Sequence, residues 1–381
     1  HTAYRRQRQM CIRDRAWAYY SSAADDLETY HENRAVFRRI WLRPRILRNV
    51  RYVDPSTKIL GIPSALPFYI TATALGRMGH PDGELNLTRA AAKTGLIQMI
   101  PTLSSVSFDE IIDARNQEGG PAQFFQLYVS TDRNVVANML RRAEETNVKA
   151  IFVTVDAPQL GRREQDMRMH FVDEGSNVQG GHVEKRDEGA ARAITSFIDP
   201  SFDWDDVLWM KRQTRLPILL KGVQTWEDAV QAYEMGLAGV VLSNHGGRQL
   251  DFARSGVEVL EEVMRELRKR GSFPNPAFQV MVDGGFRRGT DILKALAMGA
   301  TAVGIGRPFL YAYSAYGVDG VIHAINLLRD ELEMNMRLIG ARSIEELVPS
   351  MVDLSALHNH TGAVFPKQDQ SVLDFMEKSR L

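Results

Sequence analysis

The chain has 381 residues, of which 44% are hydrophobic and 25% charged, a composition typical of a folded globular protein. Its 47 basic and 47 acidic side chains balance, so we expect neither nucleic acid nor a membrane surface as a partner. The single cysteine, Cys11, excludes an intrachain disulfide framework and cysteine-rich zinc sites. No apolar run approaches the ~18 residues of a membrane span, and no metal site is predicted.

Short apolar runs alternate with amphipathic stretches along the chain. Most runs are continuously rich in Val, Ile, Leu and Phe, as in parallel strands that are covered on both faces. We expect strands at residues 66–71, 95–100, 123–128, 150–155, 217–221, 239–242, 278–282 and 302–306. Helices are expected at residues 82–94, 107–117, 132–147, 225–235, 256–270, 289–298 and 330–338, with Asp82, Asp132 and Thr225 as N-caps. This order predicts an α/β fold, a (β/α)8 TIM barrel, with an open doubly wound sheet as the alternative.

Three segments fall outside this alternation. Residues 1–15 are arginine-rich, and we expect them to be a non-native or fragment-edge segment, or else a basic targeting arm. Residues 16–381 are expected to form the barrel domain, with residues 171–192 as a mobile loop over its mouth or as an idle surface insertion. The final residues Ser379, Arg380 and Leu381 resemble a peroxisomal address, so a peroxisomal location is expected.

Polar side chains follow the predicted strands at the points where the strands end. In a barrel these ends meet at one rim, where active sites lie. His245, flanked by glycines after the sixth strand, suits a general base, and Asp156 could orient it. Arg163 and Arg248 offer planar forks for a carboxylate, and Tyr128 offers a phenol. The remaining histidines are interpreted as bystanders: His31, His80, His170, His182, His323, His358 and His360.

Glycine-rich turns at residues 283–289 and 304–307 follow the last two strands. Barrels often bind phosphate there through backbone N–H groups, and Arg307 could pair with it. Glycines that only form tight turns are the alternative. Lys221, at the end of the fifth strand, could form a Schiff base, stand beside a ring that gains negative charge, or make a structural ion pair.

The chain resembles the FMN-dependent 2-hydroxy-acid dehydrogenase family, which includes glycolate oxidase, mandelate dehydrogenase and the fungal lactate dehydrogenases that use cytochrome c. The resemblance extends from about residue 16 to the end, and the run at residues 243–248, Ser-Asn-His-Gly-Gly-Arg, is its most specific part. Residues 16–22 and 67–75 look most similar to the flavin domain of the fungal cytochrome-linked enzymes.

The resemblance implies FMN as cofactor and a role for each site residue. FMN would be held by Ala72, Thr73, Ala74, Ser104, Gln126, Thr154, Lys221, Ser243, Asp283, Gly284, Gly285, Arg287, Gly306 and Arg307. The substrate would be bound by Tyr19, Tyr128, Arg163, His245 and Arg248. His245 would be the base, backed by Asp156, with Tyr128 and Lys221 completing the catalytic set.

The expected reaction is oxidation of an L-2-hydroxy acid, lactate-like or larger, to the 2-keto acid, with oxygen accepting the electrons and giving hydrogen peroxide. Val106, in place of the Trp common in glycolate oxidases, favours the larger acid. The alternative is an L-lactate dehydrogenase of the mitochondrial intermembrane space that reduces cytochrome c through a haem domain absent from this chain. A homotetramer is expected from the family. A Schiff-base phosphosugar-binding barrel is the alternative of a different class.

Overall fold

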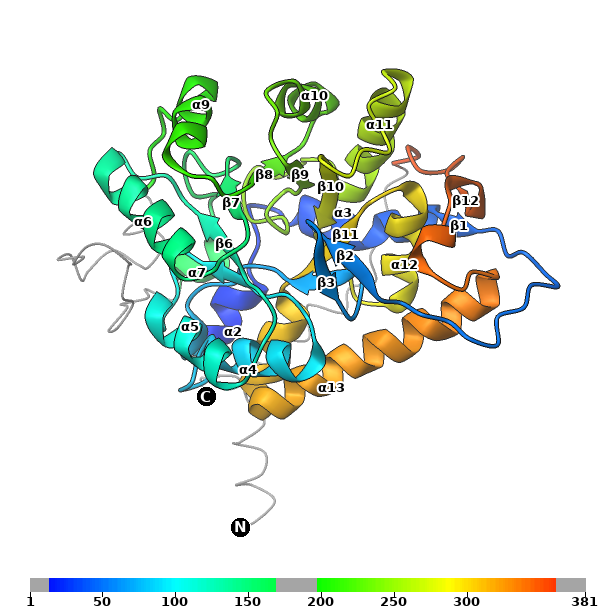
Figure 1. Cartoon of the computed structure of the whole chain (residues 1–381), viewed down its shortest axis with the longest axis horizontal. Helices are drawn as coiled ribbons and strands as arrows, with labels where there is room; N and C mark the ends of the chain where they lie inside the picture. The colour runs from blue at the N-terminus through cyan, green and yellow to red at the C-terminus, as the bar shows by residue number, and fades with distance from the viewer. Residues whose placement is uncertain (1–13, 169–196, 361–381) are drawn as a thin grey trace, which may run out of the picture.

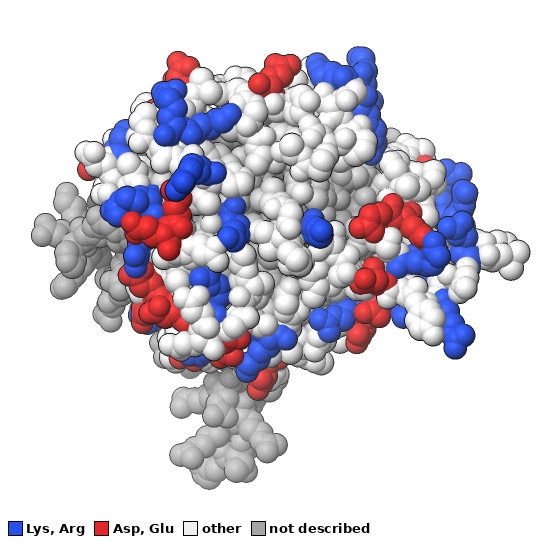
Figure 2. Space-filling model, viewed as in Figure 1, with Lys and Arg blue, Asp and Glu red and all other residues white. Residues whose placement is uncertain are grey.

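The computed structural model describes residues 14–168 and 197–360 (Figure 1). The expected loop at residues 171–192 and the final Ser379, Arg380 and Leu381 lie outside the described residues, as do residues 1–13. Among the described helices, none is both long and apolar enough to cross a membrane. On the face drawn in Figure 2, positive and negative side chains are intermixed.

Eight parallel strands form one sheet that closes on itself. They are β4 (Phe68–Ile70), β5 (Met99–Pro101), β6 (Phe124–Leu127), β7 (Ile151–Thr154), β8 (Ile218–Val223), β9 (Gly239–Leu242), β10 (Gln279–Asp283) and β11 (Ala302–Ile305). Consecutive strands are neighbours from β5 to β11, and β4 pairs with β11. A parallel bridge between Ile70 and Gln98 joins the ends, with Ile70 N donating to Ile97 O at 3.0 Å. The predicted TIM barrel is confirmed, and the open sheet is excluded.

The interior of the barrel is a packed apolar core. Every strand contributes to it, through Tyr69, Met99, Phe124, Phe152, Leu219, Val241, Met281 and Ala302. The antiparallel hairpin of β2 (Thr57–Ile59) and β3 (Ile62–Ser64) adds the fully buried Ile59 to the same cluster. A larger core fills the space between the strands and the surrounding helices. Because this interior is filled, a ligand of the barrel binds at the rim rather than inside it, as in other barrels.

The helices that cover the outside include all those expected between strands. They are α4 (Leu85–Thr94), α5 (Phe108–Gln117), α6 (Arg133–Glu145), α10 (Trp226–Glu234), α11 (Gly256–Lys269) and α12 (Gly289–Met298). Asp132 and Thr225 cap their helices by accepting from Asn134 N and Asp228 N. Asp82 does not cap α4, so that expectation is wrong: the helix begins after Glu84, and Asp82 pairs with Arg89 instead.

Several helices were not predicted from the sequence. They are α2 (Asp14–Ser21), α3 (Glu28–Ala35), α7 (Glu164–Arg168) and α9 (Trp204–Gln213). The helix expected at residues 330–338 is only the end of α13 (Arg307–Ile339), which starts directly after β11 and kinks at Gly317. In Figure 1, α13 runs along the lower edge of the barrel.

The two ends of the described chain are joined by a short antiparallel sheet. Its strands are β1 (Trp41–Leu42) and β12 (Val352–Asp353). Short 3-10 turns lie at Val36–Arg39, Gly76–Met78, Ile344–Glu346 and Pro349–Met351. This pairing places the C-terminal residues of the described chain beside the segment that follows α3.

Candidate active site

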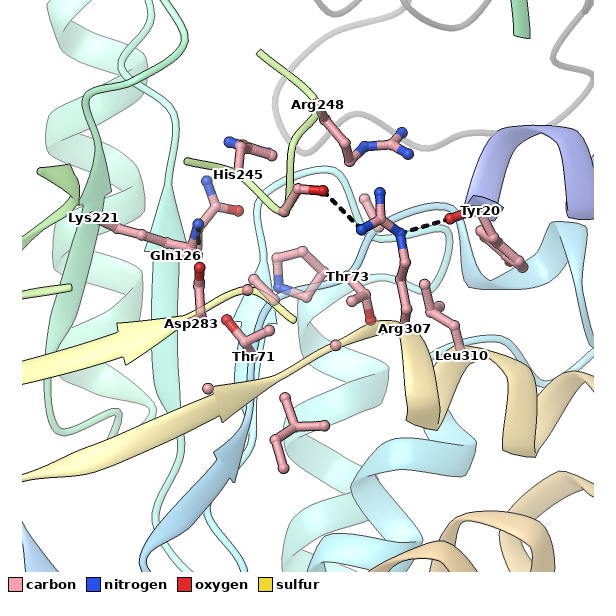
Figure 3. A pocket seen from close by; sticks show the side chains of 18 of the residues that line it. Tyr20, Thr71, Thr73, Gln126, Lys221, His245, Arg248, Asp283, Arg307 and Leu310 are labelled. Carbon is pink, nitrogen blue, oxygen red and sulfur yellow. Dashed lines mark hydrogen bonds and ion pairs between the residues drawn. The ribbon is translucent and has the colours of Figure 1, made fainter. Parts of the chain in front are cut away.

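A pocket opens at the carboxyl ends of the strands (Figure 3). The volume of its empty space, including the solvent at its mouth, is about 1090 Å³. Most of the predicted site residues line it: Tyr19, Ala72, Thr73, Ala74, Gln126, Tyr128, Thr154, Arg163, Lys221, His245, Arg248, Asp283, Gly284, Gly285, Arg287, Gly306 and Arg307. The structure thus brings residues from all eight strand ends, together with α2, around one cavity.

Three predicted residues stand behind the pocket wall. Asp156 and Ser243 contact residues that line it: Ser243 Oγ lies 3.4 Å from Lys221 Nζ and accepts from His245 N at 3.1 Å. Ser104 is fully buried and accepts a hydrogen bond from Val106 N, so in this structure its hydroxyl serves the main chain of its own loop.

The pocket also has lining residues to which the sequence assigned no individual role, although Phe286, Gly304 and Ile305 lie in the predicted phosphate turns. These are Tyr20, Thr71, Pro101, Leu103, Leu160, Gly246, Phe286, Gly304, Ile305 and Leu310. Leu103 rather than Val106 contributes to the apolar wall, because Val106 is fully buried in the outer core. The argument about substrate size therefore belongs to Leu103. An apolar lining residue has the same sequence signature as a core residue, so the pattern alone could not separate them.

His245 stands between a carboxylate and a phenol. Its Nδ1 lies 2.9 Å from Asp156 Oδ1, and its Nε2 lies 3.3 Å from the Tyr128 hydroxyl. Because an ionised carboxylate only accepts, Asp156 fixes the proton on Nδ1 and leaves Nε2 free to take a proton. His245 has a left-handed φ of 59°, and the glycines at 246 and 247 that follow it also have positive φ. This tight turn carries the imidazole into the pocket.

Burial and neighbouring charges set the protonation of this pair. Burial lowers the pKa of His245; the Asp156 charge opposes that effect and Lys221 adds to it, so the imidazole is neutral at pH 7. Burial on its own would raise the pKa of Asp156, but the interactions with His245 and Lys221 lower it overall. The result is an ionised carboxylate holding a neutral imidazole, which is the arrangement of a general base.

Lys221 is a buried cation at the floor of the pocket. Its Nζ lies 3.5 Å from Asp283 Oδ2, and both side chains are 7% exposed. Burial alone would lower the pKa of Lys221, but the charges of Asp283 and Asp156 raise it overall. A Schiff-base lysine needs a depressed pKa to supply a neutral amine. The protonated Lys221 therefore argues against the Schiff-base alternative. Its contact with Asp283 is the ion pair expected as the third option, and this pair keeps a positive charge on Lys221 in the pocket.

Two guanidinium groups share the outer side of the pocket. Burial and the charge of Arg248 lower the pKa of Arg163 to about 10. Arg248 donates to the carbonyls of Tyr19 and Ser22 at 2.9 Å and lies 4.8 Å from the centre of the Tyr19 ring. Asp166, which lies near both arginines, offsets part of their charge. The two close cations form a site for an anionic group such as a carboxylate.

Arg307 lies beside Arg248, with much of its guanidinium directed at the main chain. It donates to the carbonyls of Tyr20, Ser22 and Gly246 at 2.8–2.9 Å (Figure 3). These bonds use three of its five N–H groups, so it both fixes the His245 turn and retains donors for an anion. Burial and Arg248 lower its pKa to about 10, which leaves it charged at pH 7.

The glycines after β10 let α3 pack directly against the turn that lines the pocket. Gly284 and Gly285 have φ of 95° and 82°, and a Cβ at residue 285 would lie 1.8 Å from Asn33 O. Asn33 lies on α3 and exchanges two 2.9 Å hydrogen bonds with Asn244, the residue before His245. Arg287 lines the same part of the pocket. The N–H groups of Arg287 and Arg288 donate to Asp291 and that of Gly289 donates to Glu331, so in this structure they serve the start of α12. The side chain of Arg287 is the group here that could hold a phosphate.

Comparisons with known proteins agree with this geometry. The family model of FMN-dependent dehydrogenases matches residues 8–354. The chain is 53% identical to "L-lactate dehydrogenase (cytochrome)" of Wickerhamomyces anomalus over 90% of this chain and 59% of that protein. It is 44% identical to "Glycolate oxidase 3" of Arabidopsis thaliana over 86% of this chain and 89% of that protein.

Solved structures give the same result. The flavin-binding domain of baker's yeast flavocytochrome b2 matches with a TM-score of 0.84 and 48% identity, over 94% of this chain and 87% of that one. The barrel and its rim thus define a flavin-dependent oxidoreductase class. The chain belongs to the FMN-dependent dehydrogenase family, while it spans only about 59% of the length of the cytochrome-linked relatives.

The cofactor of this family is FMN, and the pocket fits it. The main chain of Gly284 and Gly285 lines the pocket beside Arg287 and Arg307, and these basic side chains suit the phosphate. Lys221 and Gln126 line the inner wall, with Gln126 donating to Thr154 Oγ1 at 2.9 Å. A buried lysine beside a redox ring places positive charge where electrons arrive. The basic and polar donor set therefore matches both ends of the cofactor.

Proposed function

We propose that this chain oxidises an L-2-hydroxy acid, lactate-like or larger, to the corresponding 2-keto acid by means of FMN. The observation that carries the proposal is the position of His245, held between Asp156 and Tyr128 in a pocket that is also lined by Lys221, Arg163 and Arg248. A base, a carboxylate site and a site for a redox cofactor are the parts that this reaction needs.

Substrate binding begins with the carboxylate. Arg163 and Arg248 bind it, because their neighbouring positive charges are relieved by an anion between them. Tyr19 and Tyr128 border the same space, and the Tyr128 hydroxyl donates to an oxygen of the substrate. Leu103 contributes to the apolar wall, which suits a short aliphatic or larger side chain. Fixing the carboxylate and the hydroxyl together selects one enantiomer.

Proton removal is the task of His245. Its Nε2 takes a proton from the substrate, and Asp156 stabilises the imidazolium that forms at Nδ1. FMN, when bound, would supply the acceptor for the substrate's two electrons and for its second hydrogen. Lys221 keeps a positive charge in the pocket throughout, because Asp283 and Asp156 hold it protonated.

The decisive experiment is the His245→Gln variant. Glutamine retains polarity but takes no proton, so flavin reduction by L-lactate should fall at least ~100-fold while the yellow cofactor stays bound. Stopped-flow absorbance measures the reduction, and the visible spectrum of the purified protein measures bound FMN. A normal rate of reduction in this variant would refute the assignment of the base.

We propose two possible final acceptors for the electrons removed from the substrate. Oxygen, giving hydrogen peroxide in a peroxisome, is the expectation for this chain taken by itself. Cytochrome c, with a location in the mitochondrial intermembrane space, is favoured by the 53% identity to the cytochrome-linked enzyme against 44% to glycolate oxidase. Peroxide release and cytochrome c reduction, measured side by side during turnover, decide between them.

We also propose a homotetramer. The loop between β1 and β2, which projects at the right of Figure 1, exposes Ile46, Leu47 and Tyr52 at 83%, 99% and 77%. Apolar side chains exposed to this degree in one loop are typical of a contact surface. Light scattering coupled to size-exclusion chromatography measures the assembly, and an Ile46→Ser, Leu47→Ser double variant should weaken it. A monomeric wild-type protein would refute the proposal.

A further inference from the structure

A cluster of carboxylates and imidazoles lies outside the pocket, where α3, α11 and the C-terminal residues of the described chain meet. Its members are Glu32 on α3, Glu258 on α11, and His358 and His360 after β12. One ligand atom each of Glu32, Glu258 and His360 lies within 4.8 Å of the others. None of these residues lines the pocket, so the cluster is separate from the proposed chemistry.

Glu258 is the centre of this cluster. His360 Nε2 lies 3.2 Å from its Oε1, and His358 Nδ1 lies 3.7 Å from the same oxygen. The side chain is 2% exposed, yet its Oε2 has no hydrogen-bond partner among the described residues. A buried carboxylate oxygen without a partner is rare, because its desolvation is uncompensated. The orphaned oxygen therefore indicates a missing positive ligand.

The surrounding contacts hold the histidines in place without occupying this oxygen. Leu357, just before His358, is fully buried, and its carbonyl accepts from Arg39 Nε at 2.9 Å. Arg39 also binds both oxygens of Glu32, at 3.2 Å for Nη1. A cation taking one oxygen of Glu32 would leave the other to Arg39. The nearby Arg254 directs its guanidinium to Glu262 instead.

We propose that Glu32, Glu258 and His360, with His358 as fourth ligand, bind a divalent transition metal of the zinc class. Imidazole with carboxylate suits Zn²⁺, whereas Mg²⁺ and Ca²⁺ prefer oxygen alone. Ligand atoms bound at about 2.0–2.2 Å lie roughly 3–4 Å apart. The atoms of Glu32, Glu258 and His360, now within 4.8 Å of one another, therefore need to approach by about 1–2 Å at most. Four protein ligands make a closed, structural site rather than a catalytic one.

Such an ion would link three parts of the chain that are distant in sequence: α3, α11 and the residues after β12. Glu32 precedes Asn33, and the paired amides of Asn33 and Asn244 support the turn of His245. Glu258 lies in the first turn of α11, and His360 extends from β12. Binding would therefore stabilise the folded chain in proportion to the free metal concentration.

The test uses the full FMN-loaded chain, stripped with a chelator and then titrated with Zn²⁺. Wild-type protein should retain about one Zn²⁺ per chain through this site and show a higher Tm, as expected for a ligand of the folded state. His360→Ala and Glu258→Gln should each weaken this binding at least about tenfold, the loss that follows even from removing an outer partner of a metal ligand. Mg²⁺ at the same concentration should produce no shift.

Controls separate this site from other histidines. His323→Ala removes an exposed histidine of α13 outside the cluster and should leave zinc binding unchanged. The visible flavin spectrum reports whether each variant is folded, and if Glu258→Gln loses FMN then His360→Ala decides alone. Equal zinc binding in wild type and His360→Ala would show that the histidines only make ion pairs with Glu258, and would overturn the proposal. The readout is bound metal, so the result is independent of the proposed oxidation.

Discussion

At the scale of single residues, the behaviour of the site depends on buried charges placed next to one another. Asp156 raises the pKa of His245 against burial and Lys221, which lower it. The net pKa of His245 lies below its ordinary value of about 6.5. Because the neutral imidazole is the active form, kcat/KM should be lost as pH falls through this lowered pKa and stay level above it.

The Asp156→Asn variant tests this balance. Removing the carboxylate charge takes away an effect that raises the pKa of His245, so the acidic limb of the pH profile should move to still lower pH. The plateau of kcat/KM should fall about 100-fold or more, because the imidazolium loses its partner. A profile whose limb stays in place or moves upward contradicts the assignment. Bound FMN, measured from the flavin absorbance, serves as the control for folding.

The sequence predicts the polar residues of the site much better than its apolar ones. His245, Lys221 and Arg163 stand out because a charged side chain at the end of an apolar run needs a reason to be there. In the sequence, Leu103 cannot be distinguished from a leucine of the core, yet it lines the pocket. Val106 is predicted to face the substrate, but it lies in the outer core. The direction of a side chain in a loop depends on tertiary packing, which no local pattern records.

At the scale of elements, β8 contains an irregularity that serves the site. The pairing of β8 with β9 shifts register between Lys221 and Val223, and the residue between them, Gly222, has a φ of 114°. A Cβ there would lie 2.6 Å from Asp156 Cβ and Cγ. The absence of a side chain at residue 222 therefore lets Asp156 reach His245.

Gly222→Ala is expected to damage catalysis more than folding. The positive φ alone should lower the free energy of unfolding by about 1–2 kcal/mol when alanine replaces glycine. The added methyl group should also displace the Asp156 carboxylate and so lower the rate of flavin reduction by at least ~10-fold, as a misplaced catalytic group does. Chemical denaturation and stopped-flow reduction measure the two effects. Gly119→Ala is the matched control, because Gly119 also has a positive φ but nothing within 4 Å of the added Cβ. Equal loss of activity in both variants contradicts the steric explanation.

The elements that sequence patterns miss are those stabilised from a distance. Helix α3 has Leu27 at its N-cap and no capping side chain of its own. Asp251, from the loop after β9, accepts from Thr29 N at 2.8 Å and from Asp26 N and Glu28 N. Because the capping side chain belongs to a residue more than two hundred positions away, a local capping rule finds neither the accepting residue nor the helix start. The helices between strands, with caps such as Thr225, follow local rules and are predicted.

At the scale of the whole molecule, FMN should contribute to stability by mass action. A ligand at about 100 times its Kd stabilises the folded state by about 2.7 kcal/mol, which raises Tm by roughly 3–4 °C for a chain of 381 residues. Thermal unfolding followed at increasing FMN concentration measures this rise. Riboflavin lacks the phosphate that Arg287 and the neighbouring turn would bind, so it should produce a smaller rise in Tm. A Tm independent of FMN contradicts the fit of cofactor and pocket.

The closure of the barrel also has a consequence for how the chain is made. The seam pairs Phe68 of β4 with Val303 of β11, so the first and last strands of the sheet are partners. During synthesis β4 leaves the ribosome long before β11 exists, and its edge stays without its final neighbour for almost the whole of translation. Contacts this far apart in sequence form slowly. The nascent chain therefore passes through an open sheet with two unprotected edges, and a chaperone that covers the edge of β4 should raise the yield of folded protein.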